Sequence, residues 1–122
     1  MGWIFILLLA DLDPVQIQQV LLNLVTNGMD AMEDTSGPRQ LTIRSEMQAE
    51  NEIRVTVEDR GPGLTPEAAA RMFEPFFSTK PEGTGMGLAI CRSIVEAHDG
   101  RIWAEKSMEG NTMLRFTIRV QS

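Results

Sequence analysis

Apolar residues recur at intervals of three and four from Val15 to Glu33, which is the spacing of one face of an α-helix. Asp13 and Pro14 suit the start of this helix, because aspartate is a favoured N-cap residue and proline fits the first helical position. The apolar face consists of Ile17, Leu21, Leu24, Val25, Gly28 and Met32. The pattern predicts a long helix that packs on an apolar core.

Two more helices are expected later in the chain. Residues 87–97 form a mostly apolar helical segment, and Gly100 is expected to end it because glycine readily takes the left-handed conformation. A shorter helix is expected from Thr65 or Pro66 to about Met72.

Strands are indicated where apolar and polar residues alternate. The clearest runs are Ile53 to Asp59 and Thr112 to Val120, with shorter ones over residues 41–47 and 101–105. The continuous apolar run Trp3 to Leu9 is expected to be a buried first strand. About five strands and three helices predict one α+β domain over residues 1–122. Its architecture would be a two-layer α/β sandwich, with a mixed sheet covered on one face by helices.

Composition narrows the function. The net charge of -6 argues against nonspecific nucleic-acid binding, which needs a basic surface. The single cysteine excludes an intramolecular disulfide and indicates a reducing, cytoplasmic environment. The run Trp3 to Leu9 is shorter than the ~20 residues that cross a bilayer, so no membrane contact is expected.

Four polar residues stand out. Asp59 continues the apolar register of its strand, so it is either a capping residue for the glycine-rich turn after it or a buried acceptor for an exocyclic amine. Thr112 lies in the apolar register of the last strand. It is either an ordinary threonine at a strand end or a second polar contact for the heterocycle that carries the exocyclic amine. Asn23 and Asn27 share a helix face and form either a solvated surface or a ligand set for magnesium and phosphate.

A glycine-rich segment, residues 83–88, leads directly into the second strong helix. Glycines let a phosphate approach the backbone, and free N–H groups at a helix N-terminus bind anions. The segment lacks the lysine-serine ending of a Walker A motif, and no strand leads directly into it as in a Rossmann fold.

In this order the segments resemble the boxes of the histidine kinase ATP-binding domain of the GHKL superfamily, which has the Bergerat fold. The resemblance covers roughly residues 11–120 and is most similar to nitrogen- and oxygen-sensing kinases. The matching segments are Gln18–Ala31 (N box), Asp59–Leu64 (G1 box), Phe73–Lys80 (F box), Gly83–Leu88 (G2 box) and Gly110–Thr112.

The resemblance implies roles for individual residues. Asn27 would hold the magnesium that bridges the ATP phosphates, and Asn23 would support the phosphates. Asp59 would accept a hydrogen bond from the adenine amino group, with help from Thr112. The remaining binding residues it implies are Gly61 and Gly63 beside the base and Gly83, Thr84, Gly85, Met86, Gly87 and Leu88 near the phosphates. Lys80 is either a further phosphate contact or a solvent-exposed lysine of the lid, and the second interpretation is favoured. Residues 73–84 would form an ATP lid with a hinge at Gly83.

The expected activity is transfer of the γ-phosphoryl group of ATP to a histidine on a separate dimerisation and phosphoacceptor domain, with a response regulator as the indirect partner. His98, the single histidine, lacks the flanking pattern of a phosphoacceptor and is interpreted as structural. The alternatives are an ATPase of the same superfamily, an anti-sigma-type serine kinase, and a noncatalytic nucleotide-binding or engineered module. Asn23 argues against the ATPase, since those members place a glutamate there as the general base.

The chain departs from the family pattern in a few places. Gly28 replaces the usual alanine, Met86 the commoner leucine, Leu114 a common phenylalanine, and Asp99-Gly100 the usual glycine pair. Residues 1–10 do not resemble the usual family entry, so we expect an atypical, altered or engineered first strand that could pair two copies into a homodimer.

Overall fold

The computed structural model describes residues 14–33, 37, 39–61, 63–77 and 86–119. These residues form three helices and four strands. The elements in chain order are α2 (Pro14–Ala31), β1 (Leu41–Ala49), β2 (Glu52–Asp59), α3 (Pro66–Arg71), α4 (Gly87–Ala97), β3 (Ile102–Lys106) and β4 (Thr112–Arg119). The predicted helices and strands in this part of the chain are confirmed, with bounds that differ by at most a few residues.

The four strands form one sheet in the order β1-β2-β4-β3, and every pair in it is antiparallel. The described residues thus hold four antiparallel strands of the sheet, for which the sequence predicted about five strands of mixed direction. The expected first strand, Trp3 to Leu9, lies outside the described residues, so the fifth strand and its direction stay a prediction. Short connections join β1 to β2 and β3 to β4, as suits antiparallel neighbours.

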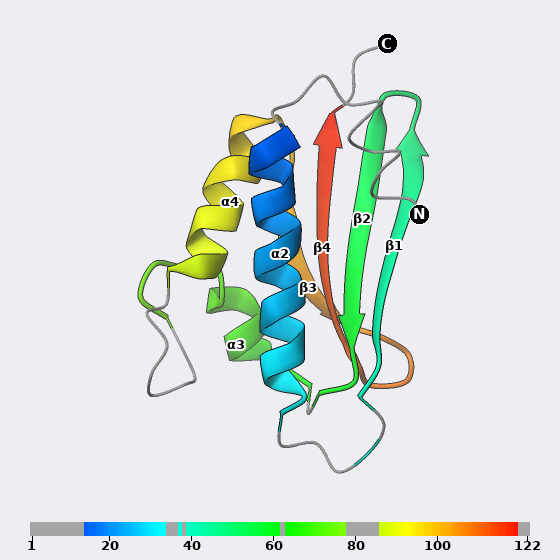
Figure 1. Cartoon of the computed structure of the whole chain (residues 1–122), viewed down its shortest axis with the longest axis vertical. Coiled ribbons are helices and arrows are strands. Elements are labelled where there is room, and N and C mark those ends of the chain that lie inside the picture. The colour runs from blue at the N-terminus through cyan, green and yellow to red at the C-terminus, as the bar shows by residue number, and fades with distance from the viewer. Residues whose placement is uncertain (1–13, 34–36, 38, 62, 78–85, 120–122) are drawn as a thin grey trace.

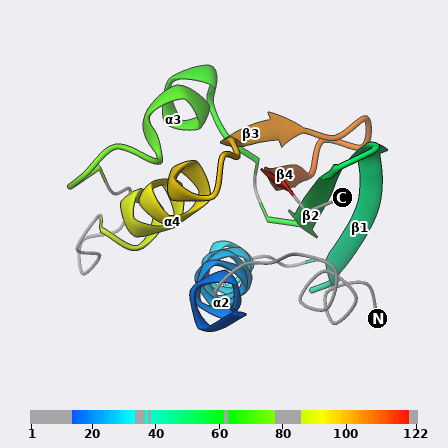
Figure 2. The same cartoon turned by 90° about the horizontal axis from the view of Figure 1, so that it is seen from above.

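The helices lie on one side of the sheet, as Figures 1 and 2 show. α2 and α4 pack side by side over the sheet, and α3 lies near the edge strand β3. The core fills the space between the layers and includes Ile17, Leu24, Val55, Val95 and Phe116, each at most 1% exposed. This confirms the predicted two-layer α+β sandwich.

The other face of the sheet is polar, because alternate strand residues point to opposite faces. Three ion pairs cross it: Arg44 to Glu58 at 3.2 Å, Arg54 to Glu46 at 2.9 Å, and Arg115 to Glu105 at 3.2 Å. The pKa values of Glu46, Glu58 and Glu105 on this face lie below their ordinary range. The largest cause is a side-chain hydrogen bond, from Arg54 to Glu46, Asn111 to Glu58 and Trp103 to Glu105.

Helix α4 ends in a Schellman motif. The Gly100 N–H donates to the carbonyl of Val95 at 3.0 Å, and the Asp99 N–H donates to that of Glu96 at 3.2 Å. Asp99 has the left-handed φ of 60° that this motif requires, although it is not a glycine. A Cβ on Gly100 would collide with the backbone of Thr117. Gly100 is thus required where the helix meets β4. The left-handed residue that ends α4 is Asp99, one position before the glycine that the sequence analysis assigned to this role.

Among the described helices, none is both long enough and apolar enough to cross a lipid bilayer.

Candidate functional site

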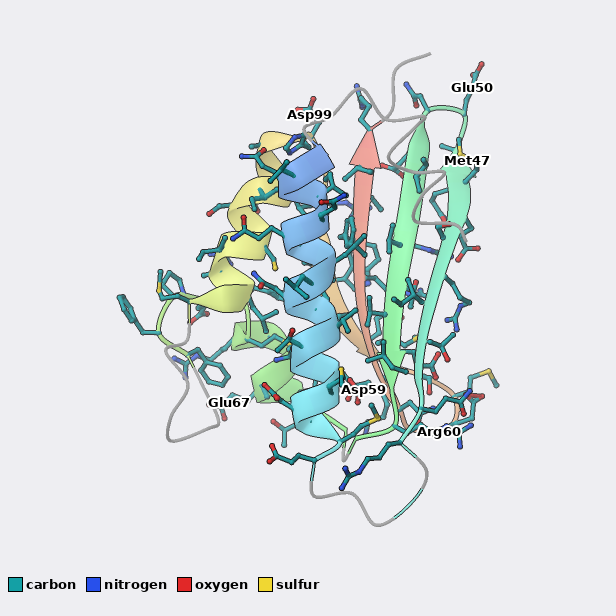
Figure 3. All side chains as sticks on the ribbon, in the orientation of Figure 1. Met47, Glu50, Asp59, Arg60, Glu67 and Asp99 are labelled. Atoms are coloured by element: carbon teal, nitrogen blue, oxygen red, sulfur yellow. The ribbon has the colours of Figure 1, made fainter. Side chains whose placement is uncertain are left out.

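The site begins with two buried polar side chains at the ends of neighbouring strands. Asp59 is the last residue of β2 and Thr112 the first of β4, and they are direct cross-strand partners. Asp59 is 1% exposed and Thr112 is 6% exposed. The positions that the apolar registers assigned to both residues on the core side of the sheet are confirmed. Figure 3 places Asp59 close to the C-terminal half of α2.

The two carboxylate oxygens of Asp59 have different surroundings. Oδ1 accepts a hydrogen bond from the Gly61 N–H at 2.8 Å, so Asp59 does cap the turn that follows it. Oδ2 lies toward α2, 3.4 Å from where a Cβ on Gly28 would stand. Burial raises the pKa of Asp59, and the hydrogen bond from Gly61 opposes the rise. One oxygen serves the turn, and the other can accept from a ligand amine.

Two glycines let α2 approach this strand end. A Cβ on Gly28 would lie 2.7 Å from Leu41 Cδ1. A Cβ on Gly61 would lie 2.8 Å from Asp59 Oδ1 and 2.9 Å from the Ala31 carbonyl oxygen. These distances are all shorter than real Cβ contacts. Gly61 is required because part of the obstacle is the backbone carbonyl of Ala31, whereas at Gly28 the obstacle is the flexible end of the Leu41 side chain, which would have to shift to admit a Cβ. Gly28, which departs from the usual alanine, leaves room for the Leu41 side chain in its present position.

The turn after β2 also depends on glycine. Gly63 has a left-handed φ of +69°, and a Cβ there would lie 3.3 Å from the Gly110 carbonyl oxygen. Gly110 itself has a φ of +87°. The two turns that flank Asp59 and Thr112 therefore pack against each other.

Asn23 and Asn27 extend the site along α2. Both side chains are partly buried, and their spacing places them one turn apart on the same helix face. Asn23 Nδ2 donates to the Gly87 carbonyl oxygen at 3.4 Å, which joins the middle of α2 to the start of α4. Asn27 makes no side-chain hydrogen bond within the described part of the chain. A partly exposed carboxamide oxygen of this kind can ligate a hard cation.

The first turn of α4 supplies backbone donors. Met86 is the N-cap residue and is partly buried, but no side chain caps the helix there. Leu88 is partly buried, and a Cβ on Gly87 would have nothing within 4 Å. The first N–H groups of a helix have no partner inside the helix, so this turn can bind an anion that approaches Gly87.

The segment between α3 and α4 is described only in part. Lys80, Gly83, Thr84 and Gly85, which the sequence placed in the site, lie outside the described residues, as does most of the expected lid. At its start Phe73 is buried, and the Arg71 guanidinium lies 4.8 Å from the centre of the Phe77 ring. Phe76 is 79% exposed and has a left-handed φ of 67°.

Leu41 is a site residue that sequence reasoning missed. It opens β1, pairs directly with Asp59 across the ladder and packs on Gly28. The sequence did mark Leu41 as the first residue of an alternating strand. It gave no sign that β1 pairs with β2, and this pairing is what brings Leu41 beside Asp59.

His98 lies at the other end of α4 from Gly87. Its Nδ1 is 2.7 Å from the Ile94 carbonyl oxygen, and a carbonyl can only accept, so Nδ1 carries the proton and donates. Figure 3 places the neighbouring Asp99 at the opposite end of the molecule from Asp59. The histidine therefore has a structural contact at the helix end, as expected.

No cluster of three or more His, Cys, Asp or Glu side chains suited to a metal ion occurs among the residues that the structure describes.

Residues 12–122 match the family described as histidine kinase-, DNA gyrase B-, and HSP90-like ATPase. Among curated proteins, the chain is 46% identical over 106 residues to the sensor protein FixL of Bradyrhizobium diazoefficiens and 43% identical over 108 residues to the sensor protein TdiS of Thauera aromatica. These alignments cover 87% of this chain but only 21% and 20% of the relatives. The chain thus spans about a fifth of the length of the curated relatives it matches.

Solved structures of histidine kinases are also similar to this chain. The catalytic domain of the histidine kinase ThkA superposes with a TM-score of 0.79 and 38% identity, over 91% of this chain and 70% of that one. ThkA in complex with the response regulator protein TrrA gives a TM-score of 0.71 at 37% identity, over 89% of this chain and 30% of that one. Full-length ShkA in complex with AMPPNP gives 0.77 at 27% identity, over 90% of this chain and 23% of that one.

Proposed function

Because this chain belongs to the family of histidine kinase-, DNA gyrase B-, and HSP90-like ATPases, we propose that it is the ATP-binding catalytic domain of a two-component sensor histidine kinase. It would transfer the γ-phosphoryl group of ATP to a histidine on a separate dimerisation and phosphoacceptor domain. The observation that carries the proposal is the buried pair Asp59 and Thr112 beside α2, which carries Asn23 and Asn27.

The adenine end of the site fits this proposal. Asp59 Oδ2 is an acceptor in an apolar setting, where a hydrogen bond from an exocyclic amino group is stronger than in water. A guanine base presents a carbonyl oxygen at the corresponding ring position, and this oxygen would face the carboxylate with no proton between them. Asp59 therefore selects adenine, while Gly61 and Gly63 keep the adjoining turn close to it.

The phosphate end would be held by α2 and α4. Asn27 supplies one carboxamide oxygen for magnesium, and phosphate oxygens and water would complete the coordination, as is usual for this ion. Magnesium, when bound, would neutralise charge on the phosphates. Gly87 and Leu88 would donate backbone N–H groups to the same phosphates, with Met86 and the undescribed Gly83, Thr84, Gly85 and Lys80 beside them.

Phosphoryl transfer to a histidine breaks the bond between the γ-phosphorus and its bridging oxygen and forms a phosphorus–nitrogen bond. This chain would position the nucleotide and neutralise its charge, and the acceptor domain would supply the nitrogen. Asn23 has no carboxylate with which to take a proton from water, so it favours this reaction over the ATPase alternative. His98 makes its contact at the far end of α4.

The wider setting follows from the same proposal. The chain would act in the cytoplasm as part of a longer sensor protein. The response regulator would receive the phosphoryl group from the acceptor domain; the complex of ThkA with TrrA motivates this partner. Residues 1–10 would be an atypical first strand through which two copies could pair; they lie outside the described residues.

A direct test compares two products. The chain is incubated with ATP, magnesium and a histidine hairpin domain from a related sensor kinase, and both phosphohistidine and free phosphate are measured. A kinase domain yields phosphohistidine with little free phosphate in the first turnover. Rapid phosphate release with no labelled hairpin would support the ATPase alternative instead.

A further inference from the structure

We propose that Asn23 is a positioning residue whose carboxamide fixes the first turn of α4, the turn that presents backbone N–H groups to the nucleotide phosphates. The role in phosphate binding rests on the function proposed above, because it assumes that α4 meets the phosphates of ATP. The contact itself can be tested in the absence of any nucleotide.

The geometry starts from one carbonyl group. Asn23 Nδ2 donates to the Gly87 carbonyl oxygen at 3.4 Å, across 64 positions of sequence. Gly87 is the first residue of α4, so its carbonyl also faces the N–H of the residue four positions later, Cys91. Asn23 thus adds a second donor to the carbonyl on which the first turn of α4 closes.

Cys91 adds a second link between the same two helices. Its side chain is fully buried, and its thiol donates to the Val20 carbonyl oxygen at 3.8 Å. One turn of α2, Val20 to Asn23, is therefore joined to one turn of α4, Gly87 to Cys91, by two hydrogen bonds.

The rest of the interface between α2 and α4 near this polar link is apolar. Beside it, α2 and α4 contribute Ile17, Leu24, Ile94 and Val95 to the buried apolar cluster. Apolar contacts tolerate small shifts along a helix, whereas directional hydrogen bonds specify one arrangement. Asn23 is thus placed to set where α4 begins relative to Asn27.

The residue type at position 23 matters for the same reason. A glutamate here, as in the ATPases of this superfamily, would bring an acceptor toward the Gly87 carbonyl and could not donate to it when ionised. An asparagine donates to Gly87 through its nitrogen. The change that removes a general base therefore also creates the contact that holds α4.

The experiment uses Cys91 as a built-in probe, because it is the single cysteine of the chain. Burial raises the pKa of its thiol to about 11, so it reacts with 5,5′-dithiobis(2-nitrobenzoic acid) only when the first turn of α4 opens. We expect Asn23→Ala to speed this reaction about fivefold in nucleotide-free protein, the effect of one hydrogen bond. Asn27→Ala is the matched control, one turn later on the same helix face, and should react like the wild type.

A second readout separates positioning from general loosening. Asn23→Ala should weaken ATP and ADP binding several-fold while leaving adenosine binding unchanged, since adenosine has no phosphate for α4 to meet. Asn23→Asp conserves the side-chain size but cannot donate when ionised, so it should behave like Asn23→Ala; it also serves if the alanine variant fails to fold.

The outcomes are distinct. Cys91 reactivity that stays at the wild-type rate in both Asn23 variants would overturn the proposal, even if ATP binding fell. Faster reactivity with equal losses for ATP and adenosine would also overturn it, because it would show loosening of the whole domain. If the wild-type chain itself bound no ATP, the proposed function would fail, and the thiol measurement would still report whether Asn23 holds α4.

Discussion

Asp59 and Thr112 face each other across the ladder between β2 and β4, and both are buried where the sheet meets α2. Burial of a carboxylate without a charged partner costs free energy unless something donates to it. Gly61 donates to one oxygen, and the other oxygen is left toward the helix. This arrangement supports the proposal that a ligand donates to the second oxygen of Asp59.

Asp59→Asn should separate adenine from guanine nucleotides. The amide can still accept from the Gly61 N–H, but its nitrogen cannot accept from the adenine amino group. The ATP affinity should fall about 10- to 100-fold, as for the loss of a hydrogen bond to a charged group, while the affinity for GTP should not fall. Calorimetry with both nucleotides checks this, and an equal loss for the two would mean that Asp59 does not contact the base.

The same variant should change how stability depends on pH. Because the pKa of Asp59 is raised by burial, the folded protein binds a proton more readily than the unfolded chain. Its contribution to the free energy of unfolding therefore falls as the pH rises from the ordinary aspartate pKa of 3.8 through the raised folded value. Asp59→Asn removes this loss.

Asp59→Asn should consequently be more stable than the wild type at neutral pH, with a difference that shrinks as the pH falls toward 3.8. Glu46, Glu58 and Glu105, whose pKa values are lowered, act in the opposite direction but equally in both proteins. Urea unfolding at several pH values measures the difference. A difference that does not vary with pH would contradict the burial of a charged Asp59.

Asn27→Ala should abolish the part of ATP affinity that depends on magnesium. The expected loss is at least about tenfold with magnesium present and much smaller in EDTA, because the carboxamide oxygen would be the protein's ligand to the ion. Thr26→Ala, an exposed neighbour on the same helix, is the control and should bind ATP normally. Undiminished magnesium-dependent binding by Asn27→Ala would remove its assigned role.

Gly87→Ala should stabilise the fold and at the same time weaken ATP binding. A Cβ at Gly87 meets nothing within 4 Å, and alanine is a better helix former, so stability should rise by up to about 1 kcal/mol. The same methyl group should impede the approach of phosphate to the backbone and weaken ATP binding about tenfold. Gly37→Ala, another glycine with open space around it, is the control and should leave ATP binding unchanged. Full ATP affinity in Gly87→Ala would argue against phosphate contact there.

Asp99→Gly should stabilise the fold without affecting the site. Asp99 takes the left-handed position of the Schellman motif, where glycine has no steric cost. We expect a gain of about 0.5–1 kcal/mol, or roughly 3 °C in Tm by differential scanning calorimetry. Asp99→Ala keeps the Cβ and should show no gain; equal effects of the two substitutions would exclude backbone strain as the cause.

Local patterns were enough to predict most of the elements. The bounds of α4 were predicted correctly, because its apolar stripe and the glycines near its two ends are visible in the local sequence. The burial of Asp59 and Thr112 was also predictable, since each continues a period of two.

What the sequence did not predict depends on contacts between distant segments. The β1-β2-β4-β3 order decides that Leu41 pairs with Asp59, and no local pattern contains that order. Likewise, Asn23 and Gly87 were each assigned to the phosphates separately, but their mutual hydrogen bond appears only when α2 and α4 pack together. The fold was therefore easier to predict than the way its helices support the site.

The central claim is that this chain binds ATP and passes its phosphoryl group to a histidine on another domain. The most direct measurement incubates the chain with γ-labelled ATP and magnesium, with and without a separate histidine hairpin domain, and follows acid-labile label on each protein. The account predicts label on the hairpin, lost when Asn27→Ala replaces the wild type, and none on this chain alone. Stable label on this chain in the absence of the hairpin would contradict it.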